Sequence, residues 1–121
     1  MEKLILIVDD EPKNLKMLSD LLRRFDYEII DAEDGEQGVQ LARLKMPGLI
    51  LMDIMLPKMD GLEATRILKS DPATRHIPIV ALTAYAMKGD RERTLEAGCD
   101  GYIAKPIDIQ ELLKTVKHFL P

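Results

Sequence analysis

Five polar side chains of types that can do chemistry stand where short apolar runs of the chain end. They are Asp9, Asp10, Asp53, Thr83 and Lys105. If the apolar runs are parallel strands of one sheet, their carboxyl ends meet at one edge, where α/β proteins bind ligands. Residues separated by almost a hundred positions would then converge, and this convergence is a stronger functional signal than any single member of the set.

The three aspartates of this set predict a metal site. Carboxylates about 5 Å apart repel each other by roughly 3 kcal/mol per pair at an effective dielectric near 20, so a cation is needed to relieve the repulsion. The set contains neither histidine nor cysteine. Oxygen ligands alone favour a hard ion that keeps some of its waters, and we therefore expect Mg²⁺ as the cofactor.

The same set could also accept a phosphoryl group. With Mg²⁺ on one carboxylate oxygen of Asp53, the other oxygen is free to attack phosphorus and form an aspartyl phosphate. The transferring group needs a fixed ammonium and a further donor, which Lys105 and Thr83 can supply. Simpler readings remain open for single members: Asp9, Asp10, Asp53 or Thr83 as a helix cap, and Lys105 as a solvated surface residue.

The elements that must position these residues follow from the apolar pattern. Two continuous apolar runs, over 4–8 and 49–52, are short and end in acidic residues, which is typical of strands buried on both faces. The predicted strands cover 4–8, 27–32, 49–53, 76–83 and 101–104. Strands that alternate with helices predict an α/β fold, a doubly wound parallel sheet of five strands.

The predicted helices are marked by caps and by apolar spacing. Pro12 suits a first turn, and the inner face of that helix is predicted to carry Leu15, Leu18, Leu21, Leu22 and Phe25. Three later helices begin with capping pairs, namely Asp34 with Gln37, Asp60 with Glu63, and Asp108 with Glu111. A fourth helix is expected over 87–97 with Gly98 after its end. The inner face of the last helix is predicted to carry Ile109, Leu112, Leu113, Val116 and Leu120.

Composition limits the classes of function. A chain of 121 residues with 46% hydrophobic content predicts one domain over 1–121, without a separate output domain. Its net charge is -4 and its basic residues are scattered, which excludes nucleic acid and membrane surfaces as expected partners and makes the cytosol the expected location. Cys99 is the only cysteine, so no intramolecular disulfide forms, and we expect a buried and inert thiol.

These motifs together resemble the receiver domain of response regulators, the CheY-like fold, over the full length of the chain. The resemblance rests on Asp9-Asp10, Asp53, Thr83-Ala84 and Lys105-Pro106, each after its strand. It implies a flavodoxin-like sheet with strand order 2-1-3-4-5. The segment 83–90 also resembles stand-alone regulators of the DivK type and the receivers of hybrid kinases.

The resemblance implies a role for each site residue. Asp53 would be the phosphoacceptor; Asp10, Asp53 and the main-chain carbonyl of Met55 would bind Mg²⁺ directly, and Asp9 through water. The Lys105–Pro106 bond would be cis and would aim the ammonium into the site. Thr83 and Tyr102 would act as the switch residues.

The resemblance also implies the partners of such a domain. The phosphoryl donor would be a histidine kinase or a His-containing phosphotransfer protein. The message would leave through the fourth helix, the fifth strand and the fifth helix to a downstream protein effector, and the chain would be a monomer or weak dimer. Such a domain assists only its own phosphorylation and dephosphorylation and is not counted as an enzyme.

Two other functions remain as alternatives. A Mg²⁺-dependent phosphatase with an aspartate nucleophile would normally carry a second carboxylate two residues further on, where this chain has Met55. A receiver-shaped adaptor that is never phosphorylated would be expected to lack part of the acidic, threonine and lysine set. Met55 and Tyr85, two residues beyond Asp53 and Thr83, could exclude water and slow self-dephosphorylation. His76 and His118 are isolated, and neither is assigned to phosphotransfer.

Overall fold

The structure, a computed structural model, describes residues 3–56, 58–83 and 88–121. Within these residues, five strands alternate with five helices. The strands are β1 (Leu4–Val8), β2 (Glu28–Ala32), β3 (Leu49–Asp53), β4 (Ile79–Thr83) and β5 (Gly101–Ala104). The helices are α1 (Pro12–Arg23), α2 (Gly35–Lys45), α3 (Gly61–Ser70), α4 (Lys88–Ala97) and α5 (Ile109–Phe119).

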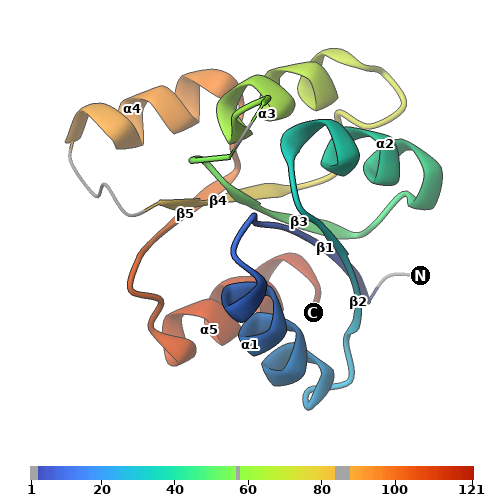
Figure 1. The fold of residues 1–121 in the computed structure, drawn as a ribbon, viewed down its shortest axis with the longest axis vertical. Helices are drawn as coiled ribbons and strands as arrows, with labels where there is room; N and C mark the ends of the chain where they lie inside the picture. The colour runs from blue at the N-terminus through green and yellow to red at the C-terminus, as the bar shows by residue number, and fades with distance from the viewer. Residues whose placement is uncertain (1–2, 57, 84–87) are drawn as a thin grey trace.

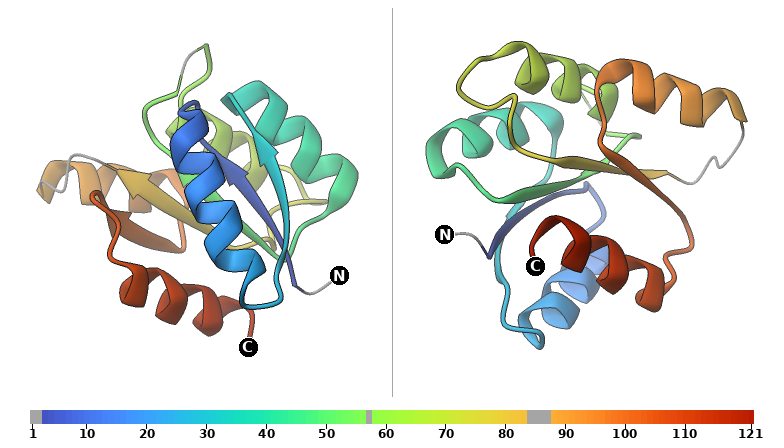
Figure 2. Two further views of the ribbon diagram at one scale, coloured as in Figure 1. Left: turned by 60° about the horizontal axis from the view of Figure 1, so that its bottom comes forward. Right: turned by 180° about the vertical axis from the view of Figure 1, so that it is seen from behind.

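All five strands are parallel and form one sheet in the order β2-β1-β3-β4-β5. This confirms the predicted fold class and strand order. Helices α1 and α5 cover one face of the sheet, and α2, α3 and α4 cover the other (Figure 1). The views from other sides show the same three layers (Figure 2). The chain adds β2 on one side of β1 and then β3, β4 and β5 on the other side. The connecting helices change from one face of the sheet to the other at this point, which is where such sheets bind ligands.

Two apolar clusters, one on each face of the sheet, explain why the central strands are apolar throughout. Ile5 and Ile7 of β1 pack with α1 and α5, whereas Leu6 and Val8 pack with α2 and α3. Successive side chains of a strand point to opposite faces, so covering both faces leaves no position for a polar residue. Fully burying one such side chain stabilises the fold by about 1.5–3 kcal/mol.

Aspartate side chains cap three of the helices, as the sequence predicted. The carboxylates of Asp34, Asp60 and Asp108 accept hydrogen bonds from backbone N–H groups of the first helical turn, with lengths of 2.8 Å at the shortest. At α2 the return bond is displaced by one residue, because Gln37 Oε1 accepts from the N–H of Glu33, the residue before the cap. These caps begin the helices directly after the loops that carry the polar site.

Two apolar residues assigned to inner helix faces are instead exposed. Phe25 lies beyond the end of α1 at Arg23 and is 51% exposed. Ile109 is the first residue of α5 and is 52% exposed. Apolar spacing fixes the buried face of a helix but not its last packed turn, so both predictions were wrong at helix ends.

The element boundaries differ from prediction by up to three residues. Strand β2 begins at Glu28, one residue late, and β4 begins at Ile79. Pro78 has no N–H to donate to a ladder, which is consistent with its place just outside β4. Gly98 follows α4 with a φ of 106°, confirming the predicted helix end. The predicted start of that helix at Met87 lies outside the described residues.

The single thiol of the chain is buried. Cys99 is 7% exposed and its Sγ lies 3.9 Å from Thr65 Oγ1. Burial raises the pKa of this thiol above its ordinary value of 9.0 and outweighs the weak bond to Thr65.

The helices of the described residues are all too short or too polar to cross a bilayer.

Candidate functional site

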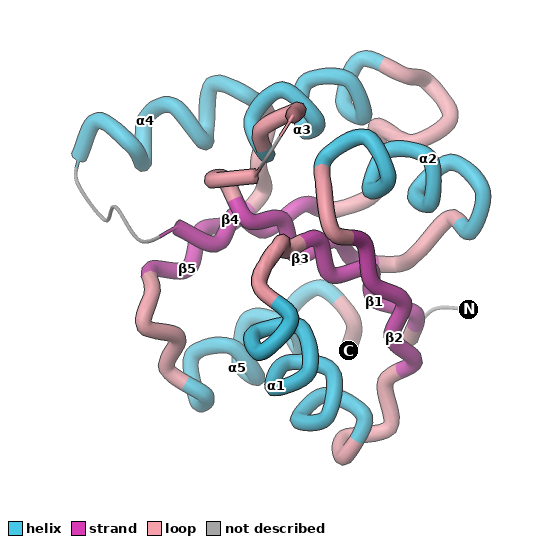
Figure 3. The backbone as a smooth tube through the Cα atoms, viewed as in Figure 1, coloured by secondary structure: helices cyan, strands magenta, loops and turns pink. Residues whose placement is uncertain are grey.

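The sheet register places the predicted site residues in one row. Val8 pairs with Met52, Asp53 with Leu82, and Thr83 with Ala104. The residues that end or follow these strands therefore stand side by side at the carboxyl edge of the sheet. The tube drawing shows this edge, where the loops after β1 and β3 begin, lying between the two helix layers (Figure 3).

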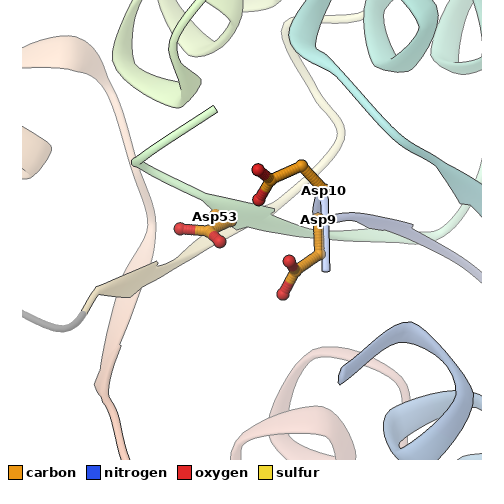
Figure 4. Close-up of side chains that lie close together, drawn as sticks. All are labelled: Asp9, Asp10 and Asp53. Atoms are coloured by element: carbon orange, nitrogen blue, oxygen red, sulfur yellow. The ribbon is translucent and has the colours of Figure 1, made fainter. Parts of the chain in front are cut away.

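The three aspartates come together as predicted. Each of Asp9, Asp10 and Asp53 offers one carboxylate oxygen, and these oxygens all lie within 4.8 Å of one another. Figure 4 shows the three side chains gathered at the carboxyl ends of β1 and β3. Asp9 and Asp53 are 0% and 4% exposed, whereas Asp10 is exposed to solvent. The site therefore has two buried carboxylates and one that faces water.

Asp9 is the most constrained of the three. Its Oδ1 accepts a hydrogen bond of 2.9 Å from the N–H of Glu11, which fixes the side chain at the start of α1. Its Oδ2 is buried and accepts no hydrogen bond within the described part of the chain. Burial, with the charges of Asp53 and Asp10, raises the pKa of this carboxyl above its ordinary 3.8, against the lowering effects of the Glu11 N–H and Lys105. An unsatisfied buried oxygen is costly, so this one needs a further partner.

Lys105 supplies the positive charge of the site. Its Nζ donates to Asp53 Oδ2 at 2.9 Å and lies 3.7 Å from Asp9 Oδ2. Burial acts to lower the pKa of Lys105, but the bond to Asp53 and the nearby negative charges raise it above its ordinary 10.5. The Lys105 N–H donates to the carbonyl of Thr83, and the Lys105–Pro106 peptide bond is cis. The ammonium therefore stays charged and close to Asp53.

Asp53 is held at both carboxylate oxygens. Oδ2 accepts from Lys105, and Oδ1 accepts from the N–H of Met55 at 3.0 Å. The backbone of Met55 thus lies beside the carboxylate, and its side chain is 57% exposed. Asp53 is consequently oriented by fixed donors before any ligand arrives.

The predicted switch residues occupy the two strands beyond β3. Thr83 is 1% exposed at the end of β4 and is therefore as deeply placed as Asp53. Tyr102 lies in β5, where it pairs with Ala81 of β4, and it is half-buried. Tyr85, proposed to shield the site from water, lies outside the described residues.

Gly61 is a site-positioning residue that sequence reasoning missed. Its N–H donates to the carbonyl of Ile54 at 2.9 Å. A Cβ added at Gly61 would collide with the main-chain carbonyl oxygen of Asp53. The start of α3 can therefore pack against the end of β3 only without a side chain. The signal available in the sequence was a glycine directly after the capping Asp60.

The donor set fits a hard divalent ion. Two oxygens bound to one Mg²⁺ lie at most about 4.2 Å apart, so oxygens within 4.8 Å need only small side-chain rotations. Asp9 Oδ2, which accepts no hydrogen bond, is an oxygen that such an ion would satisfy, either directly or through a bound water. Oxygen-only ligands also suit Mg²⁺ better than a softer metal.

The fold and the site define the class of the protein. The chain belongs to the response regulator receiver domain family, which matches residues 5–117. This confirms the resemblance inferred from the sequence. Receiver domains take part in two-component signalling, where they pair with histidine kinases and act as phosphoacceptors instead of enzymes in their own right.

Individual relatives show which receiver domains this chain resembles. The chain is 47% identical to the polar-differentiation response regulator DivK of Brucella anthropi over 120 residues, covering 99% of this chain and 98% of the relative. It is also similar to the receiver domain of a sensor histidine kinase from Pseudomonas aeruginosa, solved with magnesium in its active-site cleft. That likeness has 39% identity and a TM-score of 0.91, and it covers 98% of this chain and 97% of the other. The chemotaxis protein CheY4 of Vibrio cholerae matches with a TM-score of 0.90, 27% identity and coverage of 97% and 98%.

Proposed function

We propose that the protein is a signalling switch that accepts a phosphoryl group on Asp53. The observation that supports this most strongly is the 2.9 Å contact between Lys105 Nζ and Asp53 Oδ2 at the centre of an acidic cluster. An ammonium that touches the acceptor carboxylate is placed to meet the charge that arrives with a phosphoryl group. Its raised pKa keeps it positive at every physiological pH.

Mg²⁺ is the cofactor that this site would use. Asp9, Asp10 and Asp53 would hold it, with the main-chain carbonyl of Met55 as a further ligand. When bound, the ion would neutralise the repulsion among the carboxylates and withdraw charge from the phosphoryl oxygens. The magnesium in the similar Pseudomonas receiver supports this assignment.

In the transfer, a carboxylate oxygen of Asp53 attacks the phosphorus of a phosphohistidine. The new bond joins this oxygen to phosphorus, and the phosphorus–nitrogen bond breaks, leaving the imidazole of the donor to take up a proton. Lys105 balances the charge of one phosphoryl oxygen, and the hydroxyl of Thr83 donates to another. The donor is a histidine kinase or a His-containing phosphotransfer protein, and the cytosol is where such donors draw on ATP.

The output follows from the added charge. An aspartyl phosphate brings up to about two negative charges beside Lys105 and Thr83. Contacts that differ between the two states shift their populations, and we place the change in Thr83, Tyr102 and the face of α4, β5 and α5. A downstream protein effector would read this face. We propose that residues 1–121 act as one receiver domain, as a monomer or weak dimer.

Intact mass spectrometry after incubation with acetyl phosphate and Mg²⁺ tests the proposal. We expect one stable phosphoryl adduct, absent in Asp53→Asn and retained in the charge-matched control Asp26→Asn on an exposed turn. Rapid multiple turnover without an adduct would instead indicate a phosphatase. No adduct and no turnover would indicate an adaptor that is never phosphorylated.

A further inference from the structure

An apolar hollow with a basic rim lies at the end of the sheet opposite the acidic site. Its volume is about 460 Å³. It is lined by Lys3, Phe25, Tyr27, Leu113, Lys114, Lys117, Leu120 and Pro121. These residues lie just before β1, between α1 and β2, and on α5 and the segment after it, and Figure 2 shows these elements from two further sides. We call this surface the basal hollow.

The charges around the basal hollow do not match the rest of the chain. The protein carries a net charge of -4, yet every charged side chain that lines this hollow is a lysine. Among the described side chains, none of Lys3, Lys114 and Lys117 forms an ion pair. Three ammonium groups thus surround an apolar floor, and no carboxylate side chain is among the residues that line it.

The floor of the hollow presents apolar surface that a small anion would not use. Phe25 is 51% exposed at its edge, and Leu113 and Tyr27 are half-buried beneath it. Tyr27 donates to the carbonyl of Leu120 at 3.4 Å, which ties the start of β2 to the end of α5. A preformed concave surface with apolar walls and few polar groups is the usual form of a binding site.

We propose that the basal hollow docks an acidic peptide segment of a protein partner, with one large apolar side chain seated between Phe25 and Leu113. Acidic residues on either side of this anchor pair with the three lysines. Charge complementarity selects this occupant over a neutral or basic peptide. An anionic membrane is disfavoured, because the hollow is concave and the whole chain carries the same sign of charge as such a surface.

The basal hollow is separate from the phosphorylation site. Lys3 precedes β1 and Asp9 follows it, so the six residue steps between them set the two sites about 20 Å apart. The basal hollow shares α5 with the face proposed to change on phosphorylation, through Leu113, Lys114 and Lys117, whereas Lys3, Phe25 and Tyr27 lie outside that face. We expect docking at the basal hollow to act as a tether whose affinity depends little on the state of Asp53, because only the α5 wall of the hollow belongs to the face that changes.

Selection from a random 12-residue peptide library displayed on phage, with the full chain as bait, tests the proposal. We expect enriched peptides to carry one large apolar residue flanked by aspartate or glutamate. Chemical-shift mapping with a synthetic copy of the leading peptide should move the amide signals of Lys3, Phe25, Tyr27 and Lys117. Enrichment of basic or uncharged peptides, or shifts centred on exposed Met17 and Ile109 instead, would overturn the proposal.

Two variants and a matched control sharpen the result. Reversing two rim charges in Lys3→Glu with Lys117→Glu should weaken the leading peptide roughly ten-fold, at roughly two- to five-fold per exposed pair. The control Lys45→Glu with Arg66→Glu makes the same change in net charge away from the hollow and should leave affinity within two-fold. Phe25→Ala, at an exposed position, should weaken binding roughly three- to ten-fold. Equal losses in control and rim variants would reduce the effect to net charge and overturn the assignment.

Two further experiments distinguish peptide docking at the basal hollow from a phosphorylation-dependent surface and from a lipid-binding surface. Beryllofluoride with Mg²⁺ should change the peptide affinity by less than two-fold, and a larger change would contradict an independent tether. Vesicles of phosphatidylglycerol should not compete with the peptide, and competition would indicate a lipid-binding surface instead. Because the binding does not require Asp53, Asp53→Asn should bind the peptide normally even if the proposed phosphorylation fails.

Discussion

Replacing Asp9 by asparagine tests the electrostatics of the acidic cluster most directly. Without divalent ions and at neutral pH, we expect Asp9→Asn to raise the free energy of unfolding, although most substitutions at buried positions lower it. The expectation rests on the burial of Asp9, the lack of a hydrogen bond to its Oδ2 and the two carboxylates beside it. The asparagine can keep the hydrogen bond from the Glu11 N–H through its own Oδ1.

The size of the effect follows from the distances. At an effective dielectric near 20, each neighbouring carboxylate within 4.8 Å repels Asp9 by about 3 kcal/mol, and solvent weakens the share of exposed Asp10. Lys105 Nζ at 3.7 Å attracts Asp9 by about 4 kcal/mol. Burial of the unpartnered oxygen adds a penalty of about 1–3 kcal/mol. The repulsion and the burial penalty together exceed the attraction. We therefore expect Asp9→Asn to raise the free energy of unfolding by about 2 kcal/mol, which corresponds to about 8 °C in melting temperature for 121 residues.

Thermal unfolding with a chelator and with Mg²⁺ provides the assay. At a Mg²⁺ concentration about a hundred times the Kd, the free energy of unfolding of the wild-type protein should rise by about 2.7 kcal/mol, and that of Asp9→Asn should rise much less. The variant therefore melts higher in chelator, and the difference shrinks or reverses in Mg²⁺. A variant that melts lower in chelator, or that gains as much from Mg²⁺ as the wild-type protein, would refute the reasoning. Asp26→Asn is the control for removing one charge elsewhere.

The pH dependence gives an independent check on the same residue. Since burial raises the pKa of Asp9, the folded protein holds this proton more tightly than the unfolded chain does. The stability from this proton is present in full below the ordinary pKa of 3.8 and is lost as pH rises through the higher folded value. The advantage of Asp9→Asn in chelator should therefore grow as pH rises from about 4 and then level off. If the stability advantage of Asp9→Asn did not change with pH, the conclusion that the pKa of Asp9 is raised in the folded protein would be contradicted.

Three further predictions concern other residues of the site and core. Met55→Asn should shorten the phosphoryl lifetime on Asp53 roughly ten-fold, about 1.4 kcal/mol in the barrier, because a polar group replaces an exposed apolar one beside the acceptor; an unchanged lifetime in the mass assay would contradict it. Gly61→Ala should lower the free energy of unfolding by about 1–3 kcal/mol in chemical denaturation, because its Cβ meets the Asp53 carbonyl; a neutral result would mean that the β3–α3 contact adjusts easily. Cys99 should react with a thiol reagent only as fast as the fold opens, since burial raises its pKa, and Mg²⁺ should slow the reaction; immediate labelling of native protein would refute this.

The position of the site could be predicted from the sequence because it depends on topology. Parallel strands place their carboxyl ends on one edge, so the residues after each apolar run had to meet once the runs were identified as strands. The order and alternation of elements followed from the same runs. Neither the strand ends nor the alternation of elements depends on the details of side-chain packing.

Features that depend on packing could not be predicted. The length of α1 and the start of α5 are set by tertiary contacts, so Phe25 and Ile109 looked like core residues and are exposed. The steric demand at Gly61 arises only when α3 meets the end of β3. The unpartnered oxygen of Asp9 appears only when every donor around it has been placed, because a sequence shows a carboxylate but not what reaches it.

The electrostatic repulsion at Asp9 and the proposed affinity for Mg²⁺ would be two consequences of one arrangement. If removal of the Asp9 charge stabilises the ion-free fold, the wild-type protein holds that unfavourable energy until a cation arrives, and binding the cation releases it. Each 1.4 kcal/mol gained by Asp9→Asn in chelator should then appear as about a ten-fold weaker Kd for Mg²⁺, measured by titration. A variant that gains stability yet binds Mg²⁺ as tightly as the wild-type protein would show that the ion is held by Asp10 and Asp53 alone, with Asp9 serving only to fix the start of α1 through Glu11.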